Sequence, residues 1–231
     1  MINVENHEFL LSVYIVKLAN DVTSGIPQGA VLGPILFQIL INDTDDDVAS
    51  TVSLFDDDTR VMGPVQSEKD VENLQKDLDK IYDWQNQNNM VFNGKKFEML
   101  RYGKNADLKM DTSYLTPGCE DLIEVKESLR DLGIIMSDNA TFKNHVDKVC
   151  TTVKQKCGWI LRTFNCRETT FMKFMWKSLV QGHVDYCSQL YMPNQTSELM
   201  KLENLQKCFT KKIPAIRHLN YWQRLNQLKI Y

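Results

Sequence analysis

Three consecutive carboxylates stand in the segment Phe55-Asp56-Asp57-Asp58-Thr59, inside an otherwise apolar stretch. Adjacent carboxylates repel one another, by about 4 kcal/mol at a separation of ~4 Å and an effective dielectric constant near 20. A divalent cation bound between the carboxylates reverses the sign of that interaction. The run therefore indicates a Mg²⁺ site, with one alternative: a solvated turn in which Asp side chains bond their own backbone.

A glycine-rich loop precedes the acidic run, at Ser24-Gly25-Ile26-Pro27-Gln28-Gly29. Glycines on both sides of Pro27 and Gln28 let the backbone approach a ligand closely. The amide of Gln28 can bond a base edge or a sugar. Taken alone, the pattern favours a simple Gly-Pro turn before a core helix.

Three elements are predicted around these residues. Apolar residues on both sides of the acidic run alternate with period two, which predicts a strand–turn–strand hairpin over 51–62. The apolar run Ala30–Ile41 predicts a mostly buried helix. Ser67 and Asp70 have the spacing of a capping box, and the apolar spacing after them predicts a helix to about Asn88 that covers a sheet.

The remaining predicted elements change in kind along the chain. Further short strands are expected at 9–16, 97–102, 122–125 and 132–136. Further helices are expected near 144–163, 168–181, 196–211 and 221–229. Strands interleaved with helices, followed by helices alone, predict an α+β (or α/β-type) domain at 1–140 and an all-helical region at 141–231.

Composition narrows the class of protein. The chain has 231 residues and is 43% hydrophobic and 25% charged, as expected for a soluble globular protein. No apolar run reaches the about 18 residues of a membrane span, and the first residues do not form a secretory signal. The six cysteines form no CxxC pair, so neither a zinc site nor a disulfide-linked partner is expected. A reducing, intracellular location follows, with nucleus and cytoplasm not distinguished.

The net charge of −3 hides a strong asymmetry. Residues 141–231 contain fifteen Lys and Arg against five Asp and Glu, whereas residues 1–140 contain twelve against twenty-five. An acidic half that could hold metal is thus joined to a basic half that could hold phosphate. Two ordinary solvated surfaces remain the alternative.

Taken together, these segments resemble the reverse transcriptases of non-LTR (LINE-like, jockey-type) retrotransposons. Ser24–Phe37 is similar to the family segment S-G-x-P-Q-G-S-x-L-G-P-x-L-F, and Phe55–Thr59 is similar to F-A-D-D-T. Shorter similarities follow in the family's order and at similar spacing, at Ile41–Asp43, Asn89–Phe97, Asp131–Ile134, Tyr191–Pro193 and Lys211–Pro214. The resemblance covers nearly the whole chain.

The resemblance implies part of a polymerase palm at 1–140 and a basic thumb and connection region at 141–231. Such enzymes use two Mg²⁺ ions roughly 3.5–4 Å apart, which activate the primer 3′-hydroxyl and hold the leaving phosphates. By position, Asp57 and Asp58 would be the paired metal carboxylates. The implied partners are an RNA template, a DNA primer paired with it as an RNA–DNA hybrid, and a dNTP.

Further roles follow from the resemblance. The pocket for the incoming nucleotide and the template would be lined by Pro27, Gln28, Gly29, Phe55 and Lys96. The primer grip would be shaped by Leu132 and Gly133. The basic helices after residue 141 would follow the backbone of the hybrid.

The chain also departs from the family pattern. The family has a further metal-binding Asp upstream of the Gly-Pro-Gln loop, and the residues before Ser24 contain nothing like its F-x-D-x-x-x-A-F-D pattern. The fingers are missing as well. Asp56 stands where the family has Ala, Ala30 replaces Ser, and Phe97 replaces Cys. We therefore expect an N-terminally truncated fragment that is inactive on its own.

Two alternatives to a polymerase fragment stay open. One is a non-catalytic nucleic-acid-binding remnant, and the other is a translated pseudogene fragment without function. A separate calcium-binding loop at Asp43, Asp45 and Asp47 is not expected, because Val48 and Leu54 stand where such a loop needs Gly and Glu.

Overall fold

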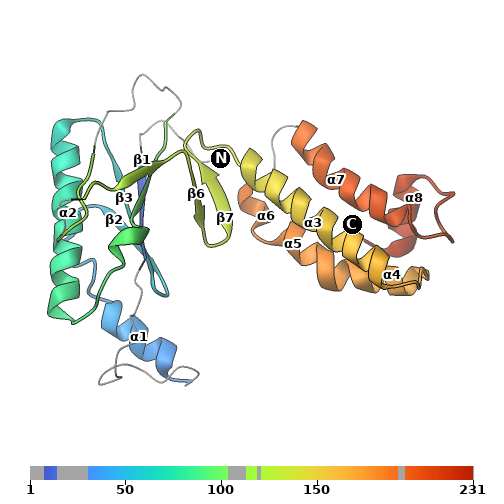
Figure 1. Cartoon of the computed structure of the whole chain (residues 1–231), viewed down its shortest axis with the longest axis horizontal. Helices are drawn as coiled ribbons and strands as arrows, with labels where there is room; N and C mark the ends of the chain where they lie inside the picture. Colours follow the sequence, from blue (N-terminus) through green and yellow to red (C-terminus); the bar gives the residue numbers. More distant parts are fainter. Residues whose placement is uncertain (1–7, 15–30, 104–112, 119–120, 192–195, 231) are drawn as a thin grey trace. The chain divides into compact units, whose positions relative to one another are not determined.

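The structure of the chain is a computed structural model that describes residues 8–14, 31–103, 113–118, 121–191 and 196–230 (Figure 1). Contacts divide the chain into two compact units. The first runs to Asp131 and includes Ser137–Ala140, and the second comprises Leu132–Met136 and Thr141–Tyr231. The predicted mixture of helices and sheets, an α+β architecture, is confirmed.

A five-stranded sheet in the order β2-β3-β1-β4-β5 forms the centre of the first unit. Its strands are β1 (Glu8–Tyr14), β2 (Thr51–Phe55), β3 (Asp58–Pro64), β4 (Glu98–Arg101) and β5 (Glu124–Lys126). Strand β1 pairs antiparallel with both β3 and β4, and β4 pairs parallel with β5. The acidic run thus connects β2 to β3 at one end of the sheet.

Helix α2 (Glu68–Gln87) packs along one face of this sheet, as predicted (Figure 1). It begins with the predicted capping box: Ser67 Oγ accepts from Asp70 N at 3.4 Å, and Asp70 Oδ2 accepts from Ser67 N at 2.9 Å. The buried core between helix and sheet includes Val61, Leu74, Leu78, Ile81 and Met99. Because side chains alternate along a strand, residues 58 and 60 of β3 face away from α2.

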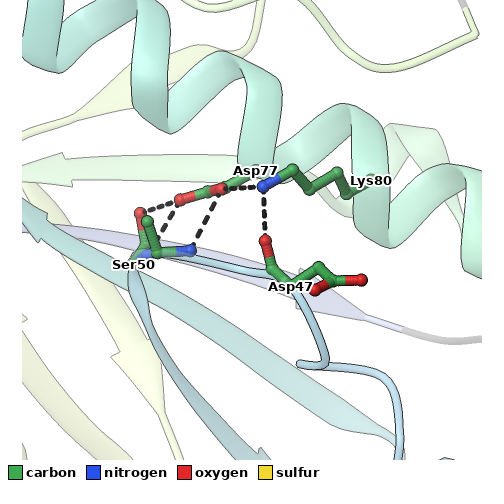
Figure 2. A network of polar contacts seen from close by, with 5 residues as sticks. Asp47, Ser50, Asp77 and Lys80 are labelled. Atoms are coloured by element: carbon green, nitrogen blue, oxygen red, sulfur yellow. Dashed lines mark hydrogen bonds and ion pairs between the residues drawn. The ribbon is translucent and has the colours of Figure 1, made fainter.

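The buried Asp77 carboxylate ties α2 to the loop that leads into β2 (Figure 2). It accepts hydrogen bonds from Ser50 N at 2.8 Å, Ser50 Oγ at 2.7 Å and Ala49 N at 3.2 Å. Lys80 Nζ lies 3.2 Å from the same carboxylate and also donates to the carbonyl of Asp47. Burial acts to raise the pKa of Asp77, but the hydrogen bonds from Ser50 and Ala49 outweigh it and hold the pKa below its usual range. The carboxylate is therefore charged and satisfied.

A separate two-stranded sheet follows, made of β6 (Ser128–Asp131) and β7 (Ile134–Ser137). The sequence predicted a strand at 132–136 and missed β6. Residues 132 and 133 are the turn of this hairpin rather than part of a strand. A 3₁₀ turn, η1 (Gly94–Lys96), precedes β4.

The described residues of the second unit after Thr141 form helices, as predicted. Its long helices are α3 (Lys143–Thr163) and α7 (Thr196–Thr210). Its shorter helical elements are α4 (Thr169–Met175), the π-helical η3 (Trp176–Gln181), α5 (Gly182–Asp185), α6 (Ser188–Tyr191) and α8 (Tyr221–Leu228). Side chains from these elements form one apolar core, in which the rings of Trp176 and Phe209 lie 5.1 Å apart. No helix in the described ranges is long and apolar enough to span a membrane.

One prediction is wrong. Helix α1 (Gly33–Ile41) forms where the apolar run predicted a helix, but it is mostly exposed. Only Ile41 is buried, while Ile35 and Ile39 are 54% and 67% exposed. A helix that is apolar on all sides needs neighbours around its whole circumference, and the described residues do not provide them.

Candidate active site

Asp56 and Asp57 form the two-residue turn between β2 and β3, and Phe55 pairs with Asp58 across the hairpin. Asp56 has φ +53°, a left-handed conformation at the first turn position, as in the turns that match the twist of a hairpin. Asp tolerates this conformation better than most residues because its short side chain can bond locally. The carboxylates are thus presented at the end of the sheet by a tight turn.

The tip of the hairpin is open to solvent. Phe55 is 58% exposed, Asp56 and Asp57 are exposed, and Asp58 is half-buried. The pKa of Asp58 lies above its usual range, first because of burial and then because of the neighbouring charge of Asp57. The negative charge of Asp131 acts in the same direction, and the positive charges of Arg60 and Lys96 oppose it. Asp58 therefore lies among four charged side chains, a setting typical of functional carboxylates.

An ion pair connects β3 to β6 beside these carboxylates. Arg60 Nε donates to Asp131 Oδ1 at 2.8 Å, and Arg60 Nη2 lies 2.6 Å from the same oxygen. The two side chains are only 13% and 11% exposed. Neither residue was singled out from the sequence, because the partners are 71 positions apart and no local pattern joins them.

Two neighbouring carboxylates are a suitable but small donor set for Mg²⁺, which usually takes one or two protein carboxylates together with water and substrate phosphates. After burial, the charge of Asp57 is the next cause of the raised pKa of Asp58, and a bound cation would relieve that repulsion. Among the residues that the structure describes, no group of three or more His, Cys, Asp or Glu could hold a metal ion. The residues present therefore fit a metal that shares its coordination with a substrate.

The central strand β1 lies directly beside the acidic hairpin. Its pairing with β3 sets Tyr14 opposite Asp58 and Ser12 opposite Arg60. The strand contains no Asp, and its one acidic residue, Glu8, pairs at the far end with Pro64. The neighbouring strand thus contributes no third carboxylate beside Asp58.

Lys96 is brought close to the hairpin, since its positive charge acts to lower the pKa of Asp58. It ends the 3₁₀ turn η1, in which Asn93 Oδ1 accepts from Lys95 N at 3.2 Å. The placement of Lys96 near Asp58, a predicted metal carboxylate, is compatible with its predicted position near a triphosphate. That role stays a prediction.

Leu132 and Gly133 form the two-residue turn between β6 and β7, with φ of +43° and +87°. Positive φ at both positions is the pattern of a type I′ hairpin turn, and it is strained for leucine. Tyr186 Oη donates to the Leu132 carbonyl at 2.7 Å and fixes this turn. Tyr186 was missed because a lone tyrosine after a short helix gives no sequence signal. The predicted primer-grip role of Leu132 and Gly133 stays a prediction.

The predicted pocket residues Pro27, Gln28 and Gly29 lie outside the described residues. Their predicted approach to the nucleotide and the template therefore stays a prediction. Of the predicted site residues that are described, those in the first unit come together at the hairpin: Phe55, Asp57, Asp58 and Lys96.

A groove lined by apolar side chains and several lysines lies between α3 and α7 in the second unit. The cavity has a volume of about 720 Å³ and is lined by residues that include Lys154, Lys201 and Lys212. Lys201 Nζ lies 2.5 Å from Asp147, so one of these charges is paired. Burial raises the pKa of Cys157, which lines the groove, to about 11, and this thiol therefore stays neutral.

Comparison with known proteins identifies the family of this chain. Residues 16–136 match the family described as reverse transcriptase (RNA-dependent DNA polymerase). The chain is also 23% identical over 207 residues to the RNA-directed DNA polymerase from mobile element jockey of Drosophila melanogaster. That match covers 83% of this chain and 22% of the relative, so the chain spans about a fifth of the relative's length. The chain therefore belongs to the reverse transcriptase (RNA-dependent DNA polymerase) family.

Proposed function

We propose that this chain is the part of an RNA-directed DNA polymerase that holds the paired metal carboxylates and the helices that bind the primer–template duplex. The first unit corresponds to part of the palm, and the second to the thumb and connection region. The observation that carries the proposal is the pair Asp57–Asp58 at an open hairpin tip, where Asp58 has a raised pKa and Lys96 lies close by.

In the proposed reaction the primer 3′-oxygen forms a bond to the α-phosphorus of a dNTP, the bond to the bridging oxygen breaks, and pyrophosphate leaves. Bound Mg²⁺ would supply activation of the hydroxyl and stabilisation of the leaving phosphates. Asp57 and Asp58 would hold the metal, and Lys96 would offset negative charge on the triphosphate. Phe55, exposed at the hairpin tip, would contact the nucleotide, together with Pro27, Gln28 and Gly29.

We further propose that the isolated chain extends primers poorly. Two carboxylates are a weak holder for two metal ions, and β1 sets Tyr14 rather than an acidic residue beside Asp58. The test is extension of a DNA primer annealed to an RNA template, with Mg²⁺ and all four dNTPs. Extension at most slightly above background is expected. Robust extension that Asp57→Ala abolishes would overturn the claim of poor activity and keep the polymerase assignment.

A non-catalytic nucleic-acid-binding role is the second candidate. The charge distribution favours it, because the second unit is strongly basic whatever the state of the metal site. This role predicts binding of the hybrid that weakens as salt rises and that Asp57→Ala leaves unchanged. A chain that binds neither duplex DNA nor hybrid at low salt would contradict both candidates.

A further inference from the structure

The ion pair between Arg60 and Asp131 stands apart from the residues that the family resemblance assigns. Its atoms lie 2.6–2.8 Å apart, and both side chains are almost fully withdrawn from solvent. Ion pairs that are open to solvent contribute little to the stability of a fold. A pair withdrawn from solvent differs, because removal of one partner leaves the charge of the other uncompensated. The pair is therefore a firm connection between β3 and β6.

Each residue of the ion pair lies close in sequence to a predicted site residue. Arg60 is two positions after Asp58 on β3, and side chains two apart on a strand share a face of the sheet. Asp131 is the last residue of β6 and is followed directly by the turn residue Leu132. The pair thus links the strand that carries a predicted metal carboxylate to the strand that ends at the predicted primer grip.

Arg60 is poorly placed for direct contact with a nucleic acid. Its side chain is 13% exposed, and its guanidinium is directed to Asp131. A phosphate-binding arginine needs its fork open to the ligand. The contribution of Arg60 is therefore made through the residues that it holds.

We propose that Arg60 is a positioning residue for primer extension, which holds Asp131, at the end of β6, beside the Asp57–Asp58 hairpin. This inference rests on the proposed function. It concerns the placement of the primer terminus, and not the overall affinity for the hybrid or the binding of metal.

The test uses the whole chain and an RNA–DNA hybrid with two reporters. A dye at the far end of the template reports total binding by anisotropy, and 2-aminopurine at the primer 3′ terminus reports how the terminus is seated. Arg60→Met should leave the Kd within about twofold of the wild type, because a withdrawn arginine contributes no phosphate contact. At saturation, the change in 2-aminopurine fluorescence on binding should be less than about half that of the wild type, because the primer terminus is no longer held in one position.

A charge-swapped variant separates positioning from general stability. Arg60→Asp combined with Asp131→Arg keeps the pair and should restore the 2-aminopurine signal, whereas each single swap should lose it. Lys126→Met is the matched control, since it removes a cation from a more exposed pair with Glu124 in the same unit. Thermal melts accompany every variant. If Arg60→Met does not fold, Arg60→Lys, which keeps the charge but loses the fork, replaces it.

The outcomes distinguish this inference from the proposed function. A wild-type chain that does not bind the hybrid overturns the proposed function, and the positioning role with it. Binding with an unchanged 2-aminopurine signal in Arg60→Met overturns the positioning role alone. A charge-swapped variant that folds but does not regain the 2-aminopurine signal also overturns the positioning role.

Discussion

At the scale of single residues, the acidic run divides into three different roles. Asp56 supplies a left-handed turn, Asp57 is exposed at the tip, and Asp58 is half-buried with a raised pKa. From the sequence, Asp56 was identified only as a residue that differs from the family's Ala. The structure adds a backbone reason for an Asp at this position, because φ +53° is unfavourable for Ala.

The turn conformation leads to a stability prediction for Asp56. Asp56→Ala should lower the free energy of unfolding by roughly 1 kcal/mol, because Ala pays the cost of the left-handed region without a compensating local bond. Asp56→Gly and Asp56→Asn should be close to the wild type. Urea unfolding followed by circular dichroism measures the difference. A destabilisation by Asn equal to that by Ala would contradict the backbone explanation.

The raised pKa of Asp58 predicts a dependence of stability on pH. A carboxyl whose pKa is higher in the folded state binds protons more readily there, so its ionisation lowers stability as pH rises through the folded-state pKa. Asp58→Asn should therefore raise the melting temperature at about pH 7 and have little effect at about pH 3, where both states are protonated. Scanning calorimetry at the two pH values tests the sign. A lower melting temperature of Asp58→Asn at neutral pH would mean that the ionised carboxylate of Asp58 stabilises the folded state.

At the scale of elements, the hairpin is held in place by contacts that the acidic segment itself does not reveal. Helix α2 is fixed to the loop before β2 by Asp77, which receives three hydrogen bonds from Ala49 and Ser50. Asp77 is only 2% exposed. The orientation of the hairpin on the sheet therefore depends on a carboxylate more than twenty residues away in sequence.

This anchoring predicts a large effect at Asp77. Asp77→Ala should destabilise the chain by about 2–4 kcal/mol, because it leaves buried donors of Ala49 and Ser50 unsatisfied. The pKa of Asp77 is lowered in the folded state, so the ionised carboxylate stabilises the fold. This stabilisation is present above the unfolded-state pKa and is lost as pH falls through the folded-state pKa. Denaturant titration measures the loss, with exposed Asp79→Ala on the same helix as the control. Equal stability of the two variants would contradict the anchoring role.

Several elements could be predicted from sequence because their signals are local. The capping box at Ser67 and the apolar spacing after it fixed α2, and alternation around the acidic run fixed the hairpin. The ion pair of Arg60 and the hydrogen bond of Tyr186 could not be predicted, since each joins distant segments. The burial of α1 was predicted wrongly, because an apolar run shows that a helix would be stabilised by apolar neighbours but does not show that such neighbours exist.

At the scale of the whole molecule, charge separates the two units. The basic residues after 141 and the acidic residues before it give the chain one end suited to phosphate and one suited to metal. Several lysines of the second unit, among them Lys154 and Lys212, line the groove between α3 and α7. We propose that these lysines contact the phosphate backbone of the hybrid.

The salt dependence of hybrid binding tests that assignment. Combined Lys154→Ala and Lys212→Ala should reduce the slope of log Kd against log salt by about 2, since each lost phosphate contact removes about one released counterion. Combined Lys69→Ala and Lys76→Ala, two exposed lysines of the first unit, should leave the slope unchanged. Anisotropy titrations over a range of salt concentrations give both slopes. A change of slope in the control pair alone would place the interface elsewhere.

We propose that Asp57 and Asp58 hold a divalent metal and that Asp56 does not. The most direct measurement is titration of the ¹⁵N-labelled chain with Mn²⁺, a paramagnetic substitute for Mg²⁺ that broadens amide signals close to its binding site. We expect the amides of Asp57 and Asp58 to broaden first, in the wild type and in Asp56→Asn, and this selectivity to vanish when both Asp57 and Asp58 are changed to Asn. Broadening that is absent from the hairpin, or that persists in the doubly substituted chain, would contradict the claim.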